Sequence, residues 1–181
     1  LLVRPDCHVR IHRVVANRNF QVFDGALALG YDSGKPDLRS GKGWEYARVG
    51  KKVSFIQNVH GFNGQVPARG FLGNPEGNNI LNKYSVVPAL RYKGAKVDGQ
   101  VLVSLVVANL KGTAPAQLAR IIAKCEVDDN LVHLLFHDGE EVYVQIGTVT
   151  DVFLTLHGQS VSGRLLFARA GKDREKLLAP P

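Results

Sequence analysis

With 181 residues, 45% of them apolar and 22% charged, the chain can form one domain with a single core, and its composition excludes a wholly disordered or a fibrous protein. The formal charge of +7 is uneven: basic residues exceed acidic ones by ten to five in residues 1–60 (+5) and by seven to two in residues 61–120 (+5), but number six against nine in residues 121–181 (−3). A basic region favours nucleic acid or an acidic partner, although the same charge could serve solubility alone.

Short alternating segments of apolar and polar residues, bounded by Gly, Asn, Asp and Lys, follow one another along the chain, which is typical of many short strands. The first such strand is predicted over residues 8–15, where Val9 and Ile11 share one face. The opposite face then carries three basic side chains: His8, Arg10 and His12. Arg10 and His12 form a basic cluster near the start of the chain, together with Arg13 and Arg18.

A second strand is predicted over residues 20–23, directly after the Asn-Arg-Asn turn at residues 17–19. Asp24-Gly25 follows, and this dipeptide is a strong signal for a tight hairpin turn. We therefore expect residues 26–31 to return antiparallel to the second strand. A polar loop should come next, before the strands that begin at Trp44.

The most informative segment is Lys-Gly-Trp-Glu-Tyr-Ala-Arg at residues 42–48. In a strand, alternate residues of this segment point to one side: Lys42, Trp44, Tyr46 and Arg48. Such a face suits single-stranded nucleic acid, because cations neutralise phosphates and flat rings stack on unpaired bases. Lys51 and Lys52 extend the charge into the following turn. The competing interpretation makes Trp44 and Tyr46 core residues, flanked by cations whose stems lie along them.

Residues 60–83 hold five glycines and two prolines, which predicts a long loop without regular structure. Strands are then predicted over residues 84–93 and 100–110, and the second is apolar enough to be central and covered on both faces. Pro88 has no amide hydrogen, so the first of these strands should be an edge strand or contain a bulge. Three further residues could extend the nucleic-acid surface: Arg91, Tyr92 and Lys93.

One helix is predicted over residues 115–124, because Pro115 suits a first helical turn and Leu118 shares a face with two isoleucines. Strand patterning returns after it, over residues 131–136, 142–146 and 149–156. The expected fold is therefore all-β and mainly antiparallel. We predict a barrel or sandwich of about eight to ten short strands with one helix, in a single domain over residues 1–181 with the loop at 60–83.

Neither a catalytic nor a metal site is expected. His133 and His137 lie four residues apart, about 13 Å along a strand, which is too far for both rings to bind one ion. The side chains of Cys7 and His8 diverge in a strand, so a thiolate would lack its base. The glycines of the 60–83 loop do not match a phosphate-binding loop. We expect a binding protein with no enzymatic activity, no metal and no cofactor.

Residues 126–151 contain seven carboxylates and no Lys or Arg, so this acidic region could face the basic part of a second copy or a protein partner. The alternative function is accordingly a β-sandwich subunit for assembly, such as a capsid-like shell or scaffold. A related alternative is recognition of a protein or glycan through the long loop.

No stretch approaches the roughly 20 apolar residues of a membrane helix. Two cysteines and the absence of an Asn-x-Ser/Thr acceptor indicate an intracellular, reducing compartment. The first residue is Leu rather than Met, which indicates a trimmed terminus from which a targeting signal could have been removed. Our hypothesis is a module that binds single-stranded RNA or DNA through ten residues: Lys42, Trp44, Tyr46, Arg48, Lys51, Lys52, Arg91, Tyr92, Lys93 and Arg10.

Overall fold

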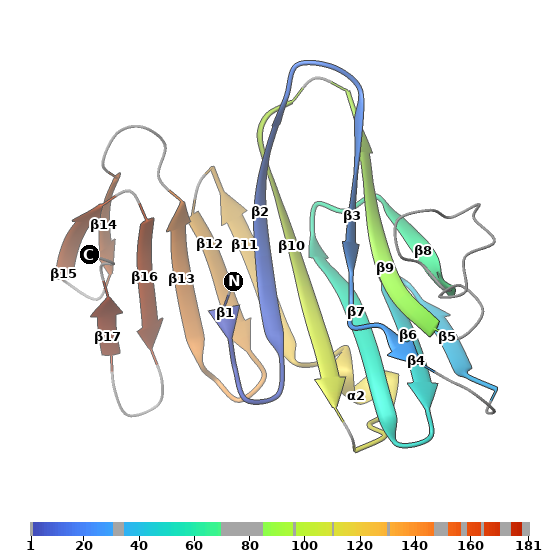
Figure 1. Cartoon of the computed structure of the whole chain (residues 1–181). Helices are drawn as coiled ribbons and strands as arrows, with labels where there is room; N and C mark the ends of the chain where they lie inside the picture. The colour runs from blue at the N-terminus through green and yellow to red at the C-terminus, as the bar shows by residue number, and fades with distance from the viewer. Residues whose placement is uncertain are drawn as a thin grey trace. The chain divides into compact units, whose positions relative to one another are not determined.

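The computed structural model describes most of the chain as short antiparallel strands with one helical turn, which confirms the predicted all-β class (Figure 1). Among the described residues the sheets are open and do not close into a barrel. They hold seventeen strands, more than predicted, because several are only two to five residues long. The structure describes the backbone of residues 2–30, 35–69, 85–95, 97–109, 111–129, 131–146, 152–156, 159–163, 165–170 and 175–178. Side chains are described for those of these residues that lie within 2–66 and 85–146.

The chain divides into two compact units, residues 1–119 and residues 120–181. Each unit has its own antiparallel sheets and is described by itself below. The prediction of one domain over residues 1–181 concerns how the two units are joined, and it stays a prediction.

The first unit contains two sheets, called here the large sheet and the small sheet. The large sheet has the strand order β1 (Leu2–Val3), β2 (His8–Ala16), β10 (Val97–Asn109), β7 (Lys52–His60), β6 (Trp44–Val49) and β5 (Asp37–Gly41). The small sheet consists of β3 (Phe20–Gly25), β9 (Ser85–Gly94), β4 (Leu29–Gly30) and β8 (Gly64–Arg69), with β9 in the centre.

The two sheets pack face to face as a sandwich, in which β9 lies against β6 and β7 (Figure 1). Their shared core is a cluster of buried apolar side chains from both layers: Ile56, Phe62, Leu90, Leu102 and Val106. We call the side of each sheet that faces this core its inner face. All residues from Val101 to Val107 are buried, as predicted for a central strand covered on both sides.

The small sheet extends only part of the way across the large one. Its edge strand β3 reaches the large sheet through Asp24, which bonds to Ser104 of β10 and to Arg10 of β2. The inner face of β2 therefore lies at the margin of the sandwich, beside β3. This position leaves the side chain of Arg10 31% exposed.

The predicted hairpin at Asp24-Gly25 does not form. Both residues belong to β3, which pairs along its length with β9, from Phe20 opposite Gly94 to Gly25 opposite Ala89. The physical reason is that the carboxylate of Asp24 is held in the interior by side chains of the large sheet, so this residue cannot serve as an exposed turn.

The predicted loop over residues 60–83 is wrong for its first part. β8 occupies residues 64–69, because Gln65 and Val66 pair with β9 across the small sheet. Residues 70–83 lie outside the described part of the chain. The predicted irregularity at Pro88 is confirmed, since the register of β8 shifts between Val66 and Arg69, where Pro88 offers no amide hydrogen.

The predicted helix over residues 115–124 is reduced to α2 (Pro115–Leu118). No side chain caps its start and its first turn holds no acidic residue, so little stabilises a longer helix. Ile122 instead begins β11 and pairs with Phe136, in agreement with the strand preference of β-branched residues. No helix among the described residues has the length and apolar content needed to span a bilayer.

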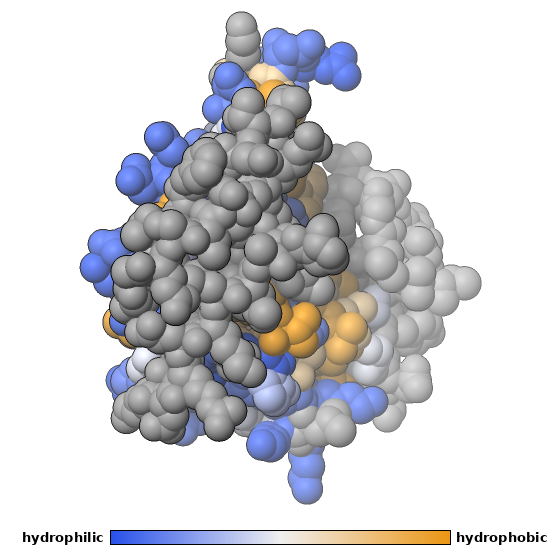
Figure 2. All heavy atoms as spheres, turned by 90° about the vertical axis from the view of Figure 1, so that its left-hand side faces the viewer, coloured by the Kyte–Doolittle hydropathy of each residue, from blue (hydrophilic) through white to orange (hydrophobic). Residues whose placement is uncertain are grey.

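The second unit contains a five-stranded antiparallel sheet and a separate hairpin. The sheet has the order β11 (Ile122–Asp128), β12 (Leu131–Phe136), β13 (Glu141–Ile146), β16 (Leu165–Ala170) and β17 (Glu175–Leu178), and the hairpin is β14 (Val152–Leu156) with β15 (Gln159–Gly163). Val132, Leu134 and Val142 are buried on one face of the sheet. On the side drawn in Figure 2, described hydrophilic residues project along the outline and apolar ones gather below the centre.

Candidate nucleic-acid interface

The strand β6 does not present two exposed rings. Tyr46 is only 1% exposed, so its ring cannot stack on a base, and burial raises the pKa of its hydroxyl. Trp44 is half-buried: its ring centroid lies 5.9 Å from that of Phe55, and its indole covers Gly41, where an added Cβ would come within 2.2 Å of the ring. These contacts favour the core interpretation for both aromatic residues.

The cations near β6 are divided between an ion-paired group and an exposed turn. Arg48 lies 3.3 Å from Asp37, which also accepts two 3.0 Å hydrogen bonds from Arg39. The hydrogen bond from Arg39 is the main reason that the pKa of Asp37 is lowered. Lys42 is exposed in the turn between β5 and β6. Arg48 is therefore partly neutralised, whereas Lys42 faces solvent.

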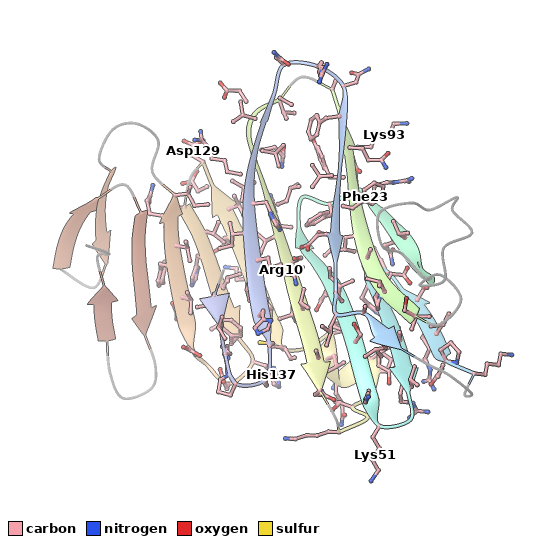
Figure 3. The ribbon with its side chains drawn as sticks, viewed as in Figure 1. Arg10, Phe23, Lys51, Lys93, Asp129 and His137 are labelled. Carbon is pink, nitrogen blue, oxygen red and sulfur yellow. The ribbon has the colours of Figure 1, made fainter. Side chains whose placement is uncertain are left out.

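Lys51, in the turn between β6 and β7, and Lys52, the first residue of β7, are both exposed at the other end of this hairpin. Lys51 is labelled in Figure 3. The carbonyl oxygen of Lys51 accepts a 3.0 Å hydrogen bond from the amide of Gly112, which brings the exposed Lys111 to the same end of the sheet. Sequence reasoning missed Lys111, because this contact joins segments about sixty residues apart. We call Lys51, Lys52 and Lys111 the lysine tip.

The three candidates of β9 separate onto the two faces of the small sheet. Arg91 and Lys93 are exposed on its outer face, the side away from the core. Tyr92 points inward, where it packs against the core cluster and its ring centroid lies 5.4 Å from that of Phe20. The strand thus supplies two cations to one surface, and Tyr92 is not part of that surface.

An aromatic side chain stands beside these cations on the neighbouring strand. Phe23 of β3 pairs directly with Arg91, and Gln21 pairs with Lys93. Phe23, which is labelled in Figure 3, lies on β3. Its exposed fraction is 40%. We call this surface the β9 face: Gln21, Phe23, Arg91 and Lys93. The spacing of Gln21 and Phe23 could have shown that they share one face of a strand. Sequence reasoning did not place them beside Arg91 and Lys93, because β3 was expected to pair with residues 26–31 and not with β9.

The third strand of the small sheet fixes the position of the β9 face. Asn63, just before β8, donates a 2.8 Å hydrogen bond to the carbonyl oxygen of Lys93 and accepts one of 2.9 Å from its amide. The side chain of Arg91 lies over Gly64, since an added Cβ there would be 3.0 Å from its Nε atom. Gly64 therefore leaves room for the guanidinium group over β8, which flanks β9 on the side opposite Phe23.

Arg10, the remaining candidate, is held in a partly buried polar network that we call the Asp24 clasp: Arg10, His12, Asp24 and Ser104. Arg10 donates from Nη1 to Oδ1 of Asp24 over 2.5 Å, and Nε2 of His12 lies 3.3 Å from Oδ2. Burial alone would raise the pKa of Asp24, but the hydrogen bonds from His12, Ser104 and Arg10 outweigh it and lower that pKa.

The clasp contains Ser, His and Asp but is not arranged as a nucleophilic triad. Ser104 and His12 both bond to the carboxylate of Asp24 rather than to each other, whereas a triad needs the imidazole between the other two. Ser104 is also fully buried, so no substrate reaches its hydroxyl. The clasp is therefore a structural joint between the sheets.

Comparisons with models of protein families, with curated proteins and with solved structures find no match. The functional inference therefore depends on surfaces of the described residues. Of the predicted residues, the structure brings Arg91 and Lys93 together on the β9 face and Lys51 and Lys52 together at the lysine tip.

A second polar cluster lies on one face of the sheet in the second unit. His133 stacks on Tyr143 with ring centroids 4.3 Å apart, and its ring nitrogens lie 3.3 Å from Glu126 and 3.1 Å from Glu141. Burial, followed by Glu126, raises the pKa of the nearby Cys125 to about 11, so this thiol stays protonated. Within the described residues, no group of three or more His, Cys, Asp or Glu side chains is arranged to hold a metal ion.

Proposed function

We propose that this protein is a non-enzymatic module that binds single-stranded RNA or DNA through the β9 face. The observation that carries the proposal is the direct pairing of the exposed Phe23 with Arg91, next to the pair of Gln21 and Lys93. Directly paired residues of antiparallel strands have Cβ atoms about 5 Å apart, so a base stacked on Phe23 would have its phosphate within reach of Arg91.

The charge of the first unit supports this assignment. Residues 1–119 contain sixteen Lys and Arg against seven Asp and Glu, a formal charge of +9. Such a charge attracts a polyanion over roughly a Debye length, about 8 Å at physiological salt. The lysine tip adds exposed cations that would increase this general attraction without contacting the bases.

The ring of Phe23 favours an unpaired strand over a duplex, because stacking requires a base that is not already stacked between neighbours. Every base has a flat face, so stacking alone does not select a sequence or distinguish RNA from DNA. We infer binding in a reducing intracellular compartment, which the count of two cysteines in the chain supports.

The test is titration of a fluorescently labelled oligothymidylate at two salt concentrations. We expect Phe23→Ala to weaken binding by about tenfold through the lost stacking contact. Lys93→Ala should reduce the slope of log Kd against log salt by about 0.7, the value for one phosphate of a single strand. Lys124→Ala is the matched control, because Lys124 is an exposed cation of the second unit that already pairs with Glu126 at 2.7 Å.

Two results would overturn the proposal. One is the absence of binding at low salt; if the protein then sediments as a large closed oligomer, the assembly alternative is favoured. The other is binding that responds equally to Phe23→Ala, Lys93→Ala and Lys124→Ala, because that would indicate attraction by total charge rather than by the β9 face.

A further inference from the structure

The margin of the sandwich beside β3 exposes a row of basic side chains on β2. β3 is the edge strand of the small sheet, and no other described strand pairs with it beyond β9. The inner face of β2 next to that edge carries three side chains, which we call the β3 step: His8, Arg10 and His12. His8 is exposed, and the side chains of Arg10 and His12 are 31% and 39% exposed.

The β3 step adjoins the proposed nucleic-acid surface because both flank the same strand. Phe23 points to the outer side of β3, and the next residue, Asp24, points inward to Arg10 and His12. Packed sheets are separated by about 10 Å. A nucleic-acid strand that continues from the β9 face over the edge of β3 would therefore reach the β3 step after crossing the thickness of one sheet.

The charge of the β3 step is set by its histidines. The positive charge of Arg10 is balanced by Asp24, its partner at 2.5 Å. β10 places uncharged Leu102, Ser104 and Val106 opposite His12, Arg10 and His8, and β1 places Val3 beside His8. The nearest connection, between β1 and β2, holds Arg4 and Asp6, whose charges pair at 3.7 Å. Protonation of His8 and His12 therefore changes the step from nearly neutral to positive.

We propose that the β3 step is a second phosphate subsite for the same single strand, and that it becomes effective when His8 and His12 are protonated. This inference rests on the proposed function of the β9 face. Histidine changes charge between about pH 5 and pH 8, and a nearby phosphate favours its protonated form. Binding of a strand long enough to reach both surfaces therefore takes up protons and is tighter at the lower pH.

The experiment measures the affinity of a short and a longer labelled oligothymidylate at about pH 6 and about pH 8. For the longer strand we expect binding to tighten by roughly fivefold to tenfold at the lower pH, and the salt slope to steepen by about 1.4, the value for two phosphates of a single strand. The short strand, which occupies the β9 face alone, should show little dependence on pH.

The variant His8→Gln/His12→Gln should remove this pH dependence. Because His12 also contacts Asp24, thermal unfolding is recorded in parallel, and His8→Gln alone, which leaves the clasp intact, should remove about half of the steepening. His137→Gln is the control, since His137 is exposed in the turn between β12 and β13 of the second unit. It should behave like the unmodified protein.

The outcomes separate the two proposals. The β3 step proposal is overturned if the longer oligonucleotide binds with the same affinity at both pH values. It is also overturned if the pH dependence survives in His8→Gln/His12→Gln. Either result leaves the proposal for the β9 face intact. The same holds if His137→Gln removes the dependence. Failure of every oligonucleotide to bind at low salt at either pH overturns the proposed function itself.

Discussion

Arg10 of β2 donates from Nη1 to Oδ1 of Asp24 on β3 over 2.5 Å, and this ion pair joins the two sheets of the first unit. The same nitrogen lies 2.6 Å from the carbonyl oxygen of Gly25, so the guanidinium group also meets the backbone of the edge strand. Asp24 is 4% exposed, and a carboxylate that is buried this deeply needs such partners to stay ionised. The clasp should therefore contribute to the stability of the sandwich.

Asp24→Asn should lower the free energy of unfolding by on the order of 2–3 kcal/mol at neutral pH, because it removes the charge while Arg10 remains partly buried. Urea denaturation measures this change. Ser104→Ala, which removes one hydrogen bond to the same carboxylate, should cost about 1 kcal/mol. Equal stability of Asp24→Asn and the unmodified protein would show that the clasp contributes nothing.

The stabilising effect of Asp24 should depend on pH. Its pKa in the folded protein is lower than the ordinary value of 3.8, so the unfolded chain takes up a proton first as the pH falls. The contribution is therefore complete above about pH 4 to 5 and is lost as the pH falls through the folded pKa. The difference in unfolding free energy between the unmodified protein and Asp24→Asn should shrink over that range.

The contribution of Glu45 to stability should change with pH in the opposite direction to that of Asp24. Glu45 is buried between β6 and β8 and accepts hydrogen bonds from Ser40 at 2.7 Å and Gln65 at 3.0 Å, both uncharged. Burial raises the pKa of Glu45 above its ordinary value of 4.5 in spite of these bonds. Its charge is thus less favourable in the folded protein than in the unfolded chain, and stability is lost as the pH rises through the folded pKa.

Glu45→Gln should therefore raise the free energy of unfolding by roughly 0.5–1 kcal/mol at neutral pH, since the neutral amide keeps the size of the side chain and the Ser40 hydroxyl can rotate to accept from it. Denaturation at neutral pH and below about pH 4 tests both the gain and its disappearance. A variant that is less stable than the unmodified protein at neutral pH would mean that the two hydrogen bonds outweigh the burial of the charge.

Sequence patterns predicted those features of the fold that depend on local periodicity. The alternation in β2 places Val9 on one side and Arg10 on the other, as observed. The apolar run in β10 is central, and Pro88 lies at a register shift. Each of these properties follows from the identity of a few consecutive residues, so no knowledge of distant segments is needed.

The pairing of β3 could not be predicted in this way, and the burial of Tyr46 was only one of two interpretations, because both features depend on distant segments. β3 pairs with β9, about seventy residues later, so the local turn signal of Asp24-Gly25 was misleading. Tyr46 lies on the side of the large sheet away from the small one, and there Gln57 donates a 3.3 Å hydrogen bond to the carbonyl oxygen of Ala119. The segment that ends at Ala119 therefore covers a face that sequence alone leaves open.

Gly64→Ala should weaken oligonucleotide binding without unfolding the protein. The added Cβ would lie 3.0 Å from Nε and 3.3 Å from Nη2 of Arg91, so the guanidinium group must leave its present place over β8 on the β9 face. Because a flexible side chain can yield, the effect on stability should be small. We expect a loss of affinity of about twofold to fivefold, as for one displaced phosphate contact. Unchanged affinity, with unchanged unfolding, would show that Arg91 does not need this position.

Trp44 is the only tryptophan of the chain, and its fluorescence distinguishes the β9 face from the surface that the sequence suggested. The indole packs on Gly41 and near Phe55, on the large sheet, whereas the β9 face belongs to the small sheet. We therefore expect oligonucleotides to bind with little quenching of tryptophan emission, since quenching by stacking requires contact between base and indole. Strong quenching that saturates together with binding would place Trp44 in the interface and return the site to β6.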